Sequence, residues 1–145
     1  MPNPIRVRGL DHVVLRVADM ERAVRFYCDV LGLSVEYRNE PLGLVHIRAG
    51  SAQIDLVDLA GKLGRQGGRP PAAEGRNVDH FCVRIEEFDT DALTAHLARH
   101  GVKIGEAGNR FGADGTGPSL YIADPDGNTV ELKGPPTHPG PAAPQ

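Results

Sequence analysis

Apolar and polar side chains alternate along two short segments of the chain, 10–17 and 78–85. In each segment every second residue is apolar, which is the period of a β-strand that buries one face. The two segments also resemble each other when they are aligned with Asp11 on Asp79, since an Asp-His pair and a later Arg then coincide. The pattern therefore indicates an internal repeat, which is the first feature to establish in a sequence.

The resemblance continues through the segment that follows each strand. Asp19 is a suitable N-cap for a helix over 20–31, whose apolar residues recur at helical spacing, and glycine at 32 can end it. Asp89 begins a second helix that runs to His100 and is followed by glycine at 101. Both copies thus predict a strand followed by a capped helix.

Three further strand-like runs follow each predicted helix. They are 34–38, 44–49 and 52–58 in the first copy, and 102–106, 119–123 and 129–133 in the second. An Asp-Pro-Asp-Gly sequence at 124–127 predicts a tight turn between the last two runs. The sequence therefore predicts an α+β fold of two tandem βαβββ modules that form a curled mixed sheet.

The predicted modules cover 8–59 and 78–133. Between them, 60–77 is rich in Gly, Pro and Arg and is expected to be a linker. The last segment, 134–145, carries several prolines and is expected to be a disordered tail. The Gly-rich stretch 107–118 is expected to be a long loop, either a lid over a site or a disordered segment.

Composition excludes several classes of function. The chain has 145 residues, a formal net charge of −3 and no cluster of Lys or Arg, so nucleic acid is not an expected partner. Its apolar runs are far shorter than a membrane span. No apolar signal core follows Arg6 and Arg8, and the two cysteines, Cys28 and Cys82, are too few for a disulfide scaffold. A cytoplasmic protein with two reduced thiols is expected.

Strand alternation places four chemically active side chains on equivalent faces. His12 and His80 fall on the face of each first strand that does not meet the helix, and Asp55 and Glu131 fall on the same face of each last strand. Two His and one or two carboxylates suit a divalent metal with open coordination positions, so the curled sheet is expected to surround a metal-binding cleft. The alternative is a metal-free pocket that keeps the strand pattern.

The chain resembles the vicinal oxygen chelate superfamily, which includes glyoxalase I, methylmalonyl-CoA epimerase, fosfomycin-resistance proteins, bleomycin-binding proteins and extradiol dioxygenases. The resemblance runs from Leu10 to about Lys133. Three stretches carry it: Leu-Asp-His-Val at 10–13, Phe-Tyr-Cys-Asp-Val-Leu-Gly at 26–32, and Asp-Pro-Asp-Gly-Asn at 124–128 leading to Val-Glu-Leu at 130–132.

The resemblance implies one divalent metal ion (Ni, Zn, Mn or Fe), with ligands at His12, His80 and Glu131 and a fourth at Asp55. Asp is a methylene shorter than the Glu or Gln usual at that position, so it either falls short of the metal or reaches it through water. The implied chemistry is chelation of two neighbouring substrate oxygens, which stabilises an enolate or oxyanion, with Glu131 and Asp55 as catalytic groups. A small-molecule substrate and a homodimer are also implied.

Three functions remain open within this resemblance. The first is a glyoxalase-like lyase or isomerase: Arg16 matches an arginine that contacts a glutathione carboxylate, although Leu59 stands where glyoxalases commonly carry Asn. The second is an iron-dependent extradiol dioxygenase, since Tyr121 lies ten residues before Glu131, and here Tyr121 is a proton donor. The third is a metal-free drug-binding module. Arg16 and Arg84 are the predicted substrate-binding residues, with a solvated strand-end charge as the alternative for Arg16.

Overall fold

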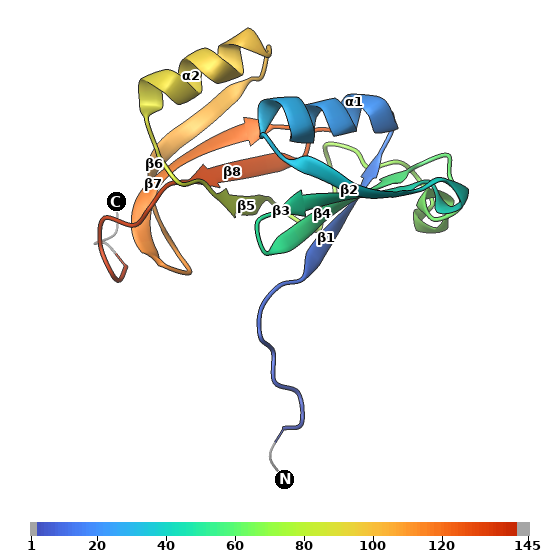
Figure 1. The fold of residues 1–145 in the computed structure, drawn as a ribbon, viewed down its shortest axis with the longest axis horizontal. Coiled ribbons are helices and arrows are strands. Elements are labelled where there is room, and N and C mark those ends of the chain that lie inside the picture. The colour runs from blue at the N-terminus through green and yellow to red at the C-terminus, as the bar shows by residue number, and fades with distance from the viewer. Residues whose placement is uncertain (1–2, 142–145) are drawn as a thin grey trace. The chain divides into compact units, whose positions relative to one another are not determined.

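The computed structural model describes residues 3–141, and the chain divides into two units, residues 1–70 and 71–145. The division falls inside the segment that the sequence predicts to be a linker. Each unit contains one four-stranded sheet and one main helix (Figure 1).

The first unit has the element order of the predicted module. Its sheet has the strand order β1-β4-β3-β2, with β1 parallel to β4 and the other pairs antiparallel. The helix α1 lies over one face of this sheet (Figure 1). The elements are β1 (His12–Val17), α1 (Met20–Arg25), a π-helical turn (Phe26–Val30), β2 (Ser34–Asn39), a 3-10 turn (Glu40–Leu42), β3 (Leu44–Ala49), β4 (Ala52–Asp58) and a 3-10 turn (Gly64–Gly67).

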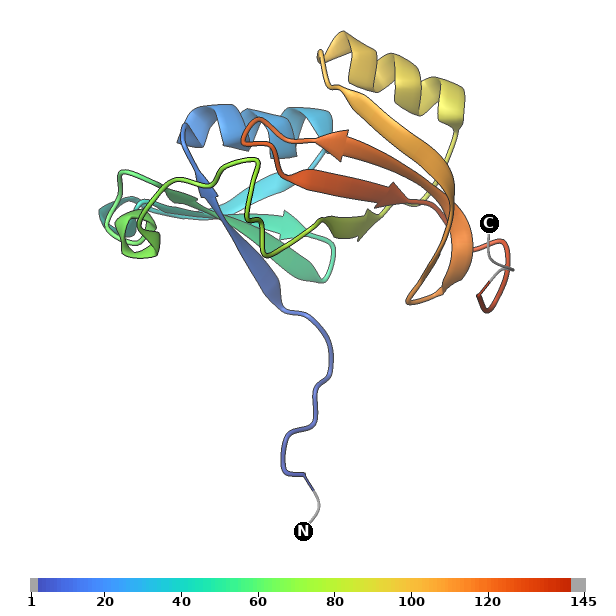
Figure 2. The ribbon, with the colours of Figure 1, turned by 180° about the vertical axis from the view of Figure 1, so that it is seen from behind.

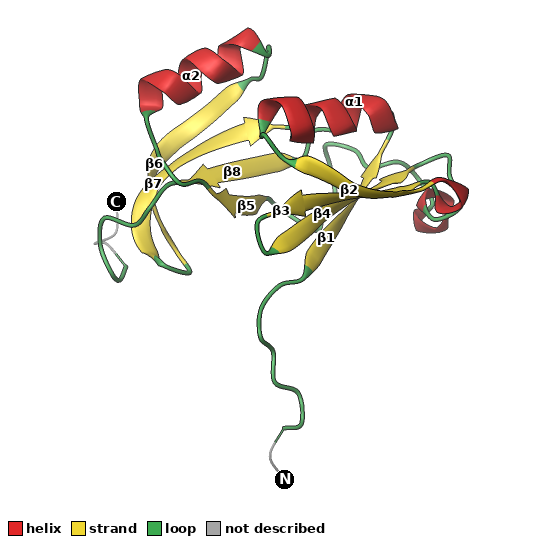
Figure 3. Ribbon diagram, viewed as in Figure 1, coloured by secondary structure: helices red, strands yellow, loops and turns green. Residues whose placement is uncertain are grey.

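The second unit repeats this topology with the strand order β5-β8-β7-β6, and β5 is parallel to β8. In Figure 2 the strands β6, β7 and β8 can be followed beside one another, and Figure 3 shows the helix that precedes them. The predicted α+β fold of two βαβββ modules is confirmed. The elements are β5 (Phe81–Arg84), α2 (Thr90–Arg99), β6 (Ile104–Gly112), β7 (Gly115–Ala123) and β8 (Thr129–Lys133).

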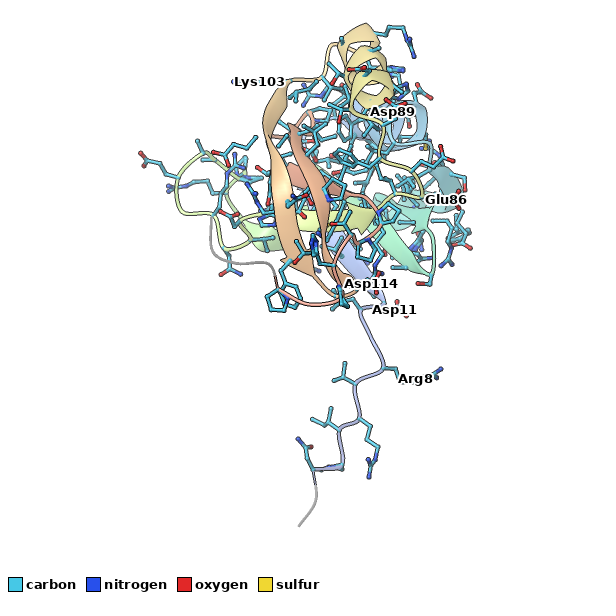
Figure 4. All side chains as sticks on the ribbon, turned by 90° about the vertical axis from the view of Figure 1, so that its left-hand side faces the viewer. Arg8, Asp11, Glu86, Asp89, Lys103 and Asp114 are labelled. Atoms are coloured by element: carbon cyan, nitrogen blue, oxygen red, sulfur yellow. The ribbon has the colours of Figure 1, made fainter. Side chains whose placement is uncertain are left out.

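Both helices begin where the sequence predicts. The carboxylates of Asp19 and Asp89 each accept a hydrogen bond of 3.0 Å from a backbone N–H in the first turn, which satisfies a donor that the helix leaves free. Figure 4 shows Asp89 at the start of α2. The first helix changes from α to π geometry at Phe26 and ends before Gly32, whose φ of 73° suits glycine.

The apolar faces of the strands meet the helices. In the first unit the fully buried side chains include Val17, Tyr27, Ile47 and Leu56, and in the second they include Leu97 and Val130. The residues between them along each strand therefore lie on the opposite face, and this is where the candidate functional side chains are found. Within residues 3–141, no helix is long and apolar enough to cross a membrane.

One local prediction was wrong. The stretch 107–118 is not a loop, because β6 and β7 pair antiparallel through it as far as Gly112 and Gly115. Its glycines obscure the two-residue period without preventing backbone pairing. In the segment predicted to be a tail, the N–H of Gly134 donates to the carbonyl of Pro118, and the carbonyl of His138 accepts from the N–H of Thr116, both at 2.9 Å. Residues 142–145 of the predicted tail lie outside the described residues.

Candidate metal-binding half-sites

In the second unit, His80 and Glu131 meet on the sheet face that does not contact α2. His80 directly precedes β5, Glu131 lies in β8, and their Nε2 and Oε1 atoms are 3.3 Å apart. Parallel pairing of β5 with β8 produces this approach, because it places Cys82 opposite Glu131 and leaves His80 beside that pair. We call His80, Glu131 and the side chains that contact them the second half-site.

The carboxylate of Glu131 is only 6% exposed, yet it is held in its charged form. Burial alone would raise the pKa of Glu131. Hydrogen bonds from Tyr121, Ser119 and Cys82, together with the charge of His80, outweigh that effect and lower the pKa below its usual value. The hydroxyl of Ser119 donates to Oε2 at 2.8 Å. Glu131 is therefore an anion at neutral pH.

The imidazole of His80 is oriented by its sequence neighbour. Its Nδ1 lies 2.6 Å from a carboxylate oxygen of Asp79, so Nδ1 carries a proton and donates to it. In the neutral ring Nε2 then has a lone pair, and this lone pair faces the Glu131 anion. Two acceptors 3.3 Å apart need a shared proton or a cation to hold them. The second half-site thus supplies two ligands, one nitrogen and one oxygen, of kinds that divalent metal ions bind.

A pocket of about 360 Å³ opens beside the second half-site. Tyr121 packs edge-on against His80 with ring centroids 5.4 Å apart, and the guanidinium of Arg110 lies 5.7 Å from the Tyr121 ring centre. Burial, and then the neighbouring Glu131, raise the pKa of Tyr121. The pocket is lined by Asp79, His80, Glu106, Arg110, Tyr121 and Thr129.

The first unit has an equivalent arrangement, which we call the first half-site. The pair of His12 with Asp11 repeats that of His80 with Asp79, with Nδ1 2.6 Å from a carboxylate oxygen. The hydrogen bond to Asp11 is the main cause that raises the pKa of His12, and the charge of Asp55 contributes to the same shift. The two Asp residues are therefore the groups that orient the two predicted histidine ligands.

Asp55 lies in β4, is 3% exposed and has one carboxylate oxygen, Oδ1, that is buried without a hydrogen-bond partner. The other oxygen, Oδ2, lies 3.0 Å from Nδ1 of His46 on β3. That distance suits an ion pair, but Nδ1 is also without a hydrogen bond, so the contact is close without being aligned. A buried polar atom without a partner costs about 1–3 kcal/mol, and a cation or water at Oδ1 would remove this cost.

The two arginines predicted to bind substrate have partners within the protein. The Arg16 guanidinium donates to the carbonyl oxygens of Gly64, Gly68 and Arg69 at 2.6–3.1 Å. A Cβ at residue 67 would come within 2.4 Å of Arg16 Nε, so a larger residue there would displace the guanidinium. Arg84 forms an ion pair of 2.6 Å with Asp114, which lies at the β6–β7 turn (Figure 4).

Comparison with known proteins agrees with this arrangement. A family model described as the glyoxalase/bleomycin resistance protein/dioxygenase superfamily matches residues 9–132. The chain belongs to this superfamily. The resemblance seen in the sequence motifs is thereby confirmed.

Individual relatives of this superfamily protein have names of several kinds. A glyoxalase domain-containing protein of Mycosarcoma maydis is 33% identical, and the match covers 88% of this chain and 69% of the relative. The glutathione transferase FosA of Serratia marcescens is 28% identical, and the match covers 87% of this chain and 80% of FosA. The solved structure of an integron cassette protein from V. Pseudocholerae has a TM-score of 0.70 and 30% identity, and the match covers 90% of this chain and 96% of that structure. Other matches are named as a catechol-2,3-dioxygenase and a probable lactoylglutathione lyase.

Within residues 3–141 of this superfamily protein, no three His, Cys, Asp or Glu side chains are grouped so that they could hold a metal ion. The structure brings His80 to Glu131 and Asp55 to His46. Sequence reasoning did not find Ser119, His46 or Arg110. Strand register could have revealed Ser119 and His46, and Arg110 was hidden because its strand was taken for a loop.

Proposed function

We propose that this protein is a metal-dependent enzyme with glyoxalase-like lyase or isomerase chemistry, acting on a small oxygen-bearing metabolite. The observation that carries the proposal is the pair of His80 Nε2 and Glu131 Oε1, which lie 3.3 Å apart and bring one nitrogen ligand and one oxygen ligand together on the same face of the sheet. The unpartnered Oδ1 of Asp55 supports it independently.

The proposed ligands are His12, His80 and Glu131, with Asp55 as the fourth. A divalent ion (Ni, Zn, Mn or Fe) bound by them would stabilise negative charge that develops on two neighbouring substrate oxygens. The identity of the ion and the association of this chain into a homodimer are parts of the same proposal. Light scattering coupled to size-exclusion chromatography would test the dimer.

The chain's own residues have separate tasks in this proposal. Glu131, and Asp55 in the first half-site, accept or return a proton of the substrate, since each is a buried carboxylate beside a proposed substrate position. Tyr121 donates a proton from the pocket wall. Arg110 faces the same pocket and suits a substrate with an anionic group. A substrate-binding role for Arg16 or Arg84 stays a prediction, because each would have to give up the contacts described above.

Ring cleavage by non-haem iron is the second candidate. The edge-on contact of Tyr121 with His80 favours it, because a phenol beside a metal-binding histidine is positioned to deliver a proton to a bound aromatic diol. Two His and one carboxylate are also the ligand set of many oxygen-using iron enzymes.

Elemental analysis of protein purified without chelator tests both candidates. We expect close to one equivalent of a transition metal, and the variants His80→Gln and Glu131→Gln should lose most of it. His100→Gln, an exposed histidine at the end of α2, is the matched control. Less than about a tenth of an equivalent, unchanged after addition of Ni, Zn, Mn or Fe, would refute the proposal.

Turnover then separates the candidates. Nickel or zinc with isomerisation of a methylglyoxal–thiol adduct supports glyoxalase-like chemistry, and iron with oxygen uptake on a catechol supports ring cleavage. A thermal shift with a bulky drug, without metal binding or turnover, would instead favour the metal-free binding module.

A further inference from the structure

The two half-sites have an equivalence that extends beyond the predicted ligands. In the first unit β3 pairs with β4 so that His46 lies opposite Asp55, and in the second β7 pairs with β8 so that Tyr121 lies opposite Glu131. On its other side each acid is paired with a residue of the parallel neighbouring strand. Asp55 lies opposite Val14 of β1, and Glu131 lies opposite Cys82 of β5. His46 is therefore the counterpart of Tyr121 in the repeat.

The counterpart in the second unit shows what this position can do. Tyr121 hydrogen-bonds to Glu131 and helps to lower the pKa of that carboxyl group. His46 lies at the equivalent place beside Asp55, with Nδ1 3.0 Å from Oδ2 but without an aligned hydrogen bond. The side chain of His46 is 26% exposed, and that of Asp55 is 5% exposed. Each buried acid thus has a polar side chain directly opposite it on the adjacent antiparallel strand.

We infer that His46 is a positioning residue that holds the Asp55 carboxylate by Oδ2, so that Oδ1 is presented to a bound cation. This inference rests on the proposed function, in which Asp55 is the fourth ligand. Two buried atoms here have no hydrogen-bond partner, His46 Nδ1 and Asp55 Oδ1. A cation bound to Oδ1 would give that oxygen a partner. It would also fix the orientation of the carboxylate, so that Nδ1 can align with Oδ2 and donate a hydrogen bond to it.

The ring of His46 is itself supported from the side. Tyr37 on β2 stacks against it with ring centroids 6.0 Å apart and an angle of 25° between the rings. Stacking restricts rotation of the imidazole and keeps Nδ1 toward β4.

Three substitutions at His46 separate positioning from ligation. His46→Asn keeps an N–H donor at the place of Nδ1, His46→Gln moves the donor to about the place of Nε2, and His46→Leu removes it. Dissociation constants for Co²⁺ and Zn²⁺ are measured by competition with a chromophoric chelator, with the Co²⁺ absorption spectrum and the urea midpoint of the metal-free protein recorded alongside. Tyr37→Phe, which keeps the stacked ring, is the control.

We expect His46→Leu and His46→Gln to weaken metal binding about 10- to 100-fold at unchanged stoichiometry. His46→Asn should stay within about threefold of the wild type, and all Co²⁺ spectra should keep the wild-type band positions, because the ligands themselves are unchanged. If His46→Leu does not fold, the difference in metal affinity between His46→Asn and His46→Gln is sufficient to test the inference.

Equal affinity in His46→Gln, His46→Leu and the wild type overturns the inference while leaving the proposed function intact. An Asn variant as weak as the Gln variant, or a Co²⁺ spectrum that changes, also overturns it, because imidazole would then be a ligand. A wild-type protein that binds no metal overturns the inference together with the proposed function. If Asp55→Asn binds metal with wild-type affinity, Asp55 is not a ligand, and this overturns the inference about His46 but not the metal site formed by the other three ligands.

Discussion

The thiol of Cys82 offers a direct measure of the charge on Glu131. Its Sγ lies 3.4 Å from Oε2 of Glu131, and the residue is exposed to reagents in solution. Burial of the sulfur, followed by the charge and the hydrogen bond of Glu131, raises the pKa of Cys82 from 9.0 to about 12. We therefore predict that Cys82 is accessible but slow to react.

The expected rate follows from two opposing effects. At pH 8 a thiol of pKa 9 is roughly one-tenth ionised, whereas one of pKa 12 is ionised to about 1 part in 10⁴, a loss of about a thousandfold in thiolate. The more basic thiolate is also the better nucleophile, with a Brønsted slope of about 0.4–0.5, which recovers roughly 20- to 30-fold. Cys82 should thus react roughly 30- to 50-fold more slowly than an ordinary accessible thiol.

The assay uses the Cys28→Ser protein, in which Cys82 is the only thiol, with 2,2′-dithiodipyridine as a neutral disulfide reagent. Glu131→Gln removes the negative charge, so we expect the rate to rise roughly 3- to 10-fold. Ser119→Ala is the matched control, because it removes a contact to the same carboxylate but leaves the charge. A wild-type rate within about twofold of an unstructured cysteine peptide, or no response to Glu131→Gln, would refute the reasoning.

Three further predictions concern stability. Arg16→Ala should lower the free energy of unfolding by about 1.5–3 kcal/mol, because three backbone carbonyl groups lose a charged hydrogen-bond donor. The same substitution should make residues 64–69 accessible to limited proteolysis. An unchanged urea midpoint and digestion pattern would contradict this prediction. Asp124→Ala should cost about 2–3 kcal/mol in urea unfolding, because its buried carboxylate accepts from the N–H groups of Asp126 and Asn128 and from the Asn128 amide. Because the folded pKa of Glu131 is depressed, its charge stabilises the fold above the unfolded value of 4.5, and this contribution is lost as the pH falls through the folded pKa. The difference in Tm between wild type and Glu131→Gln, measured without metal, should therefore shrink between pH 6 and pH 3, and a constant difference would count against it.

Much of the fold could be predicted from the sequence, because local signals and the repeat agreed. The caps at Asp19 and Asp89 are set by residues close in the chain, and a duplicated pattern tests each half against the other. The hairpin over 107–118 was missed because glycines supply no side chains from which a strand period can be recognised, although their backbone groups pair normally.

For the candidate site, the sequence predicts the proposed metal ligands but not the side chains that contact them. Alternation identifies the face of His80 and Glu131, but it gives no register between strands, and register decides that His46 faces Asp55. The partners of Arg16 were also out of reach, because they are backbone carbonyl groups of a loop whose path depends on tertiary structure.

His12 lies in β1 and His80 directly precedes β5, and both strands lie at the edge of their sheets. Among the described residues of each unit, β1 is paired only with β4, which carries Asp55, and β5 only with β8, which carries Glu131. Edge strands open most readily, so β1 and β5 should be the places where backbone amide hydrogens exchange early. A ligand that joins the histidine to the acid would fasten the edge strand to its neighbour. Affinity for that ligand and cohesion of the sheet edge are then linked thermodynamically, and a substitution that loosens either one weakens the other.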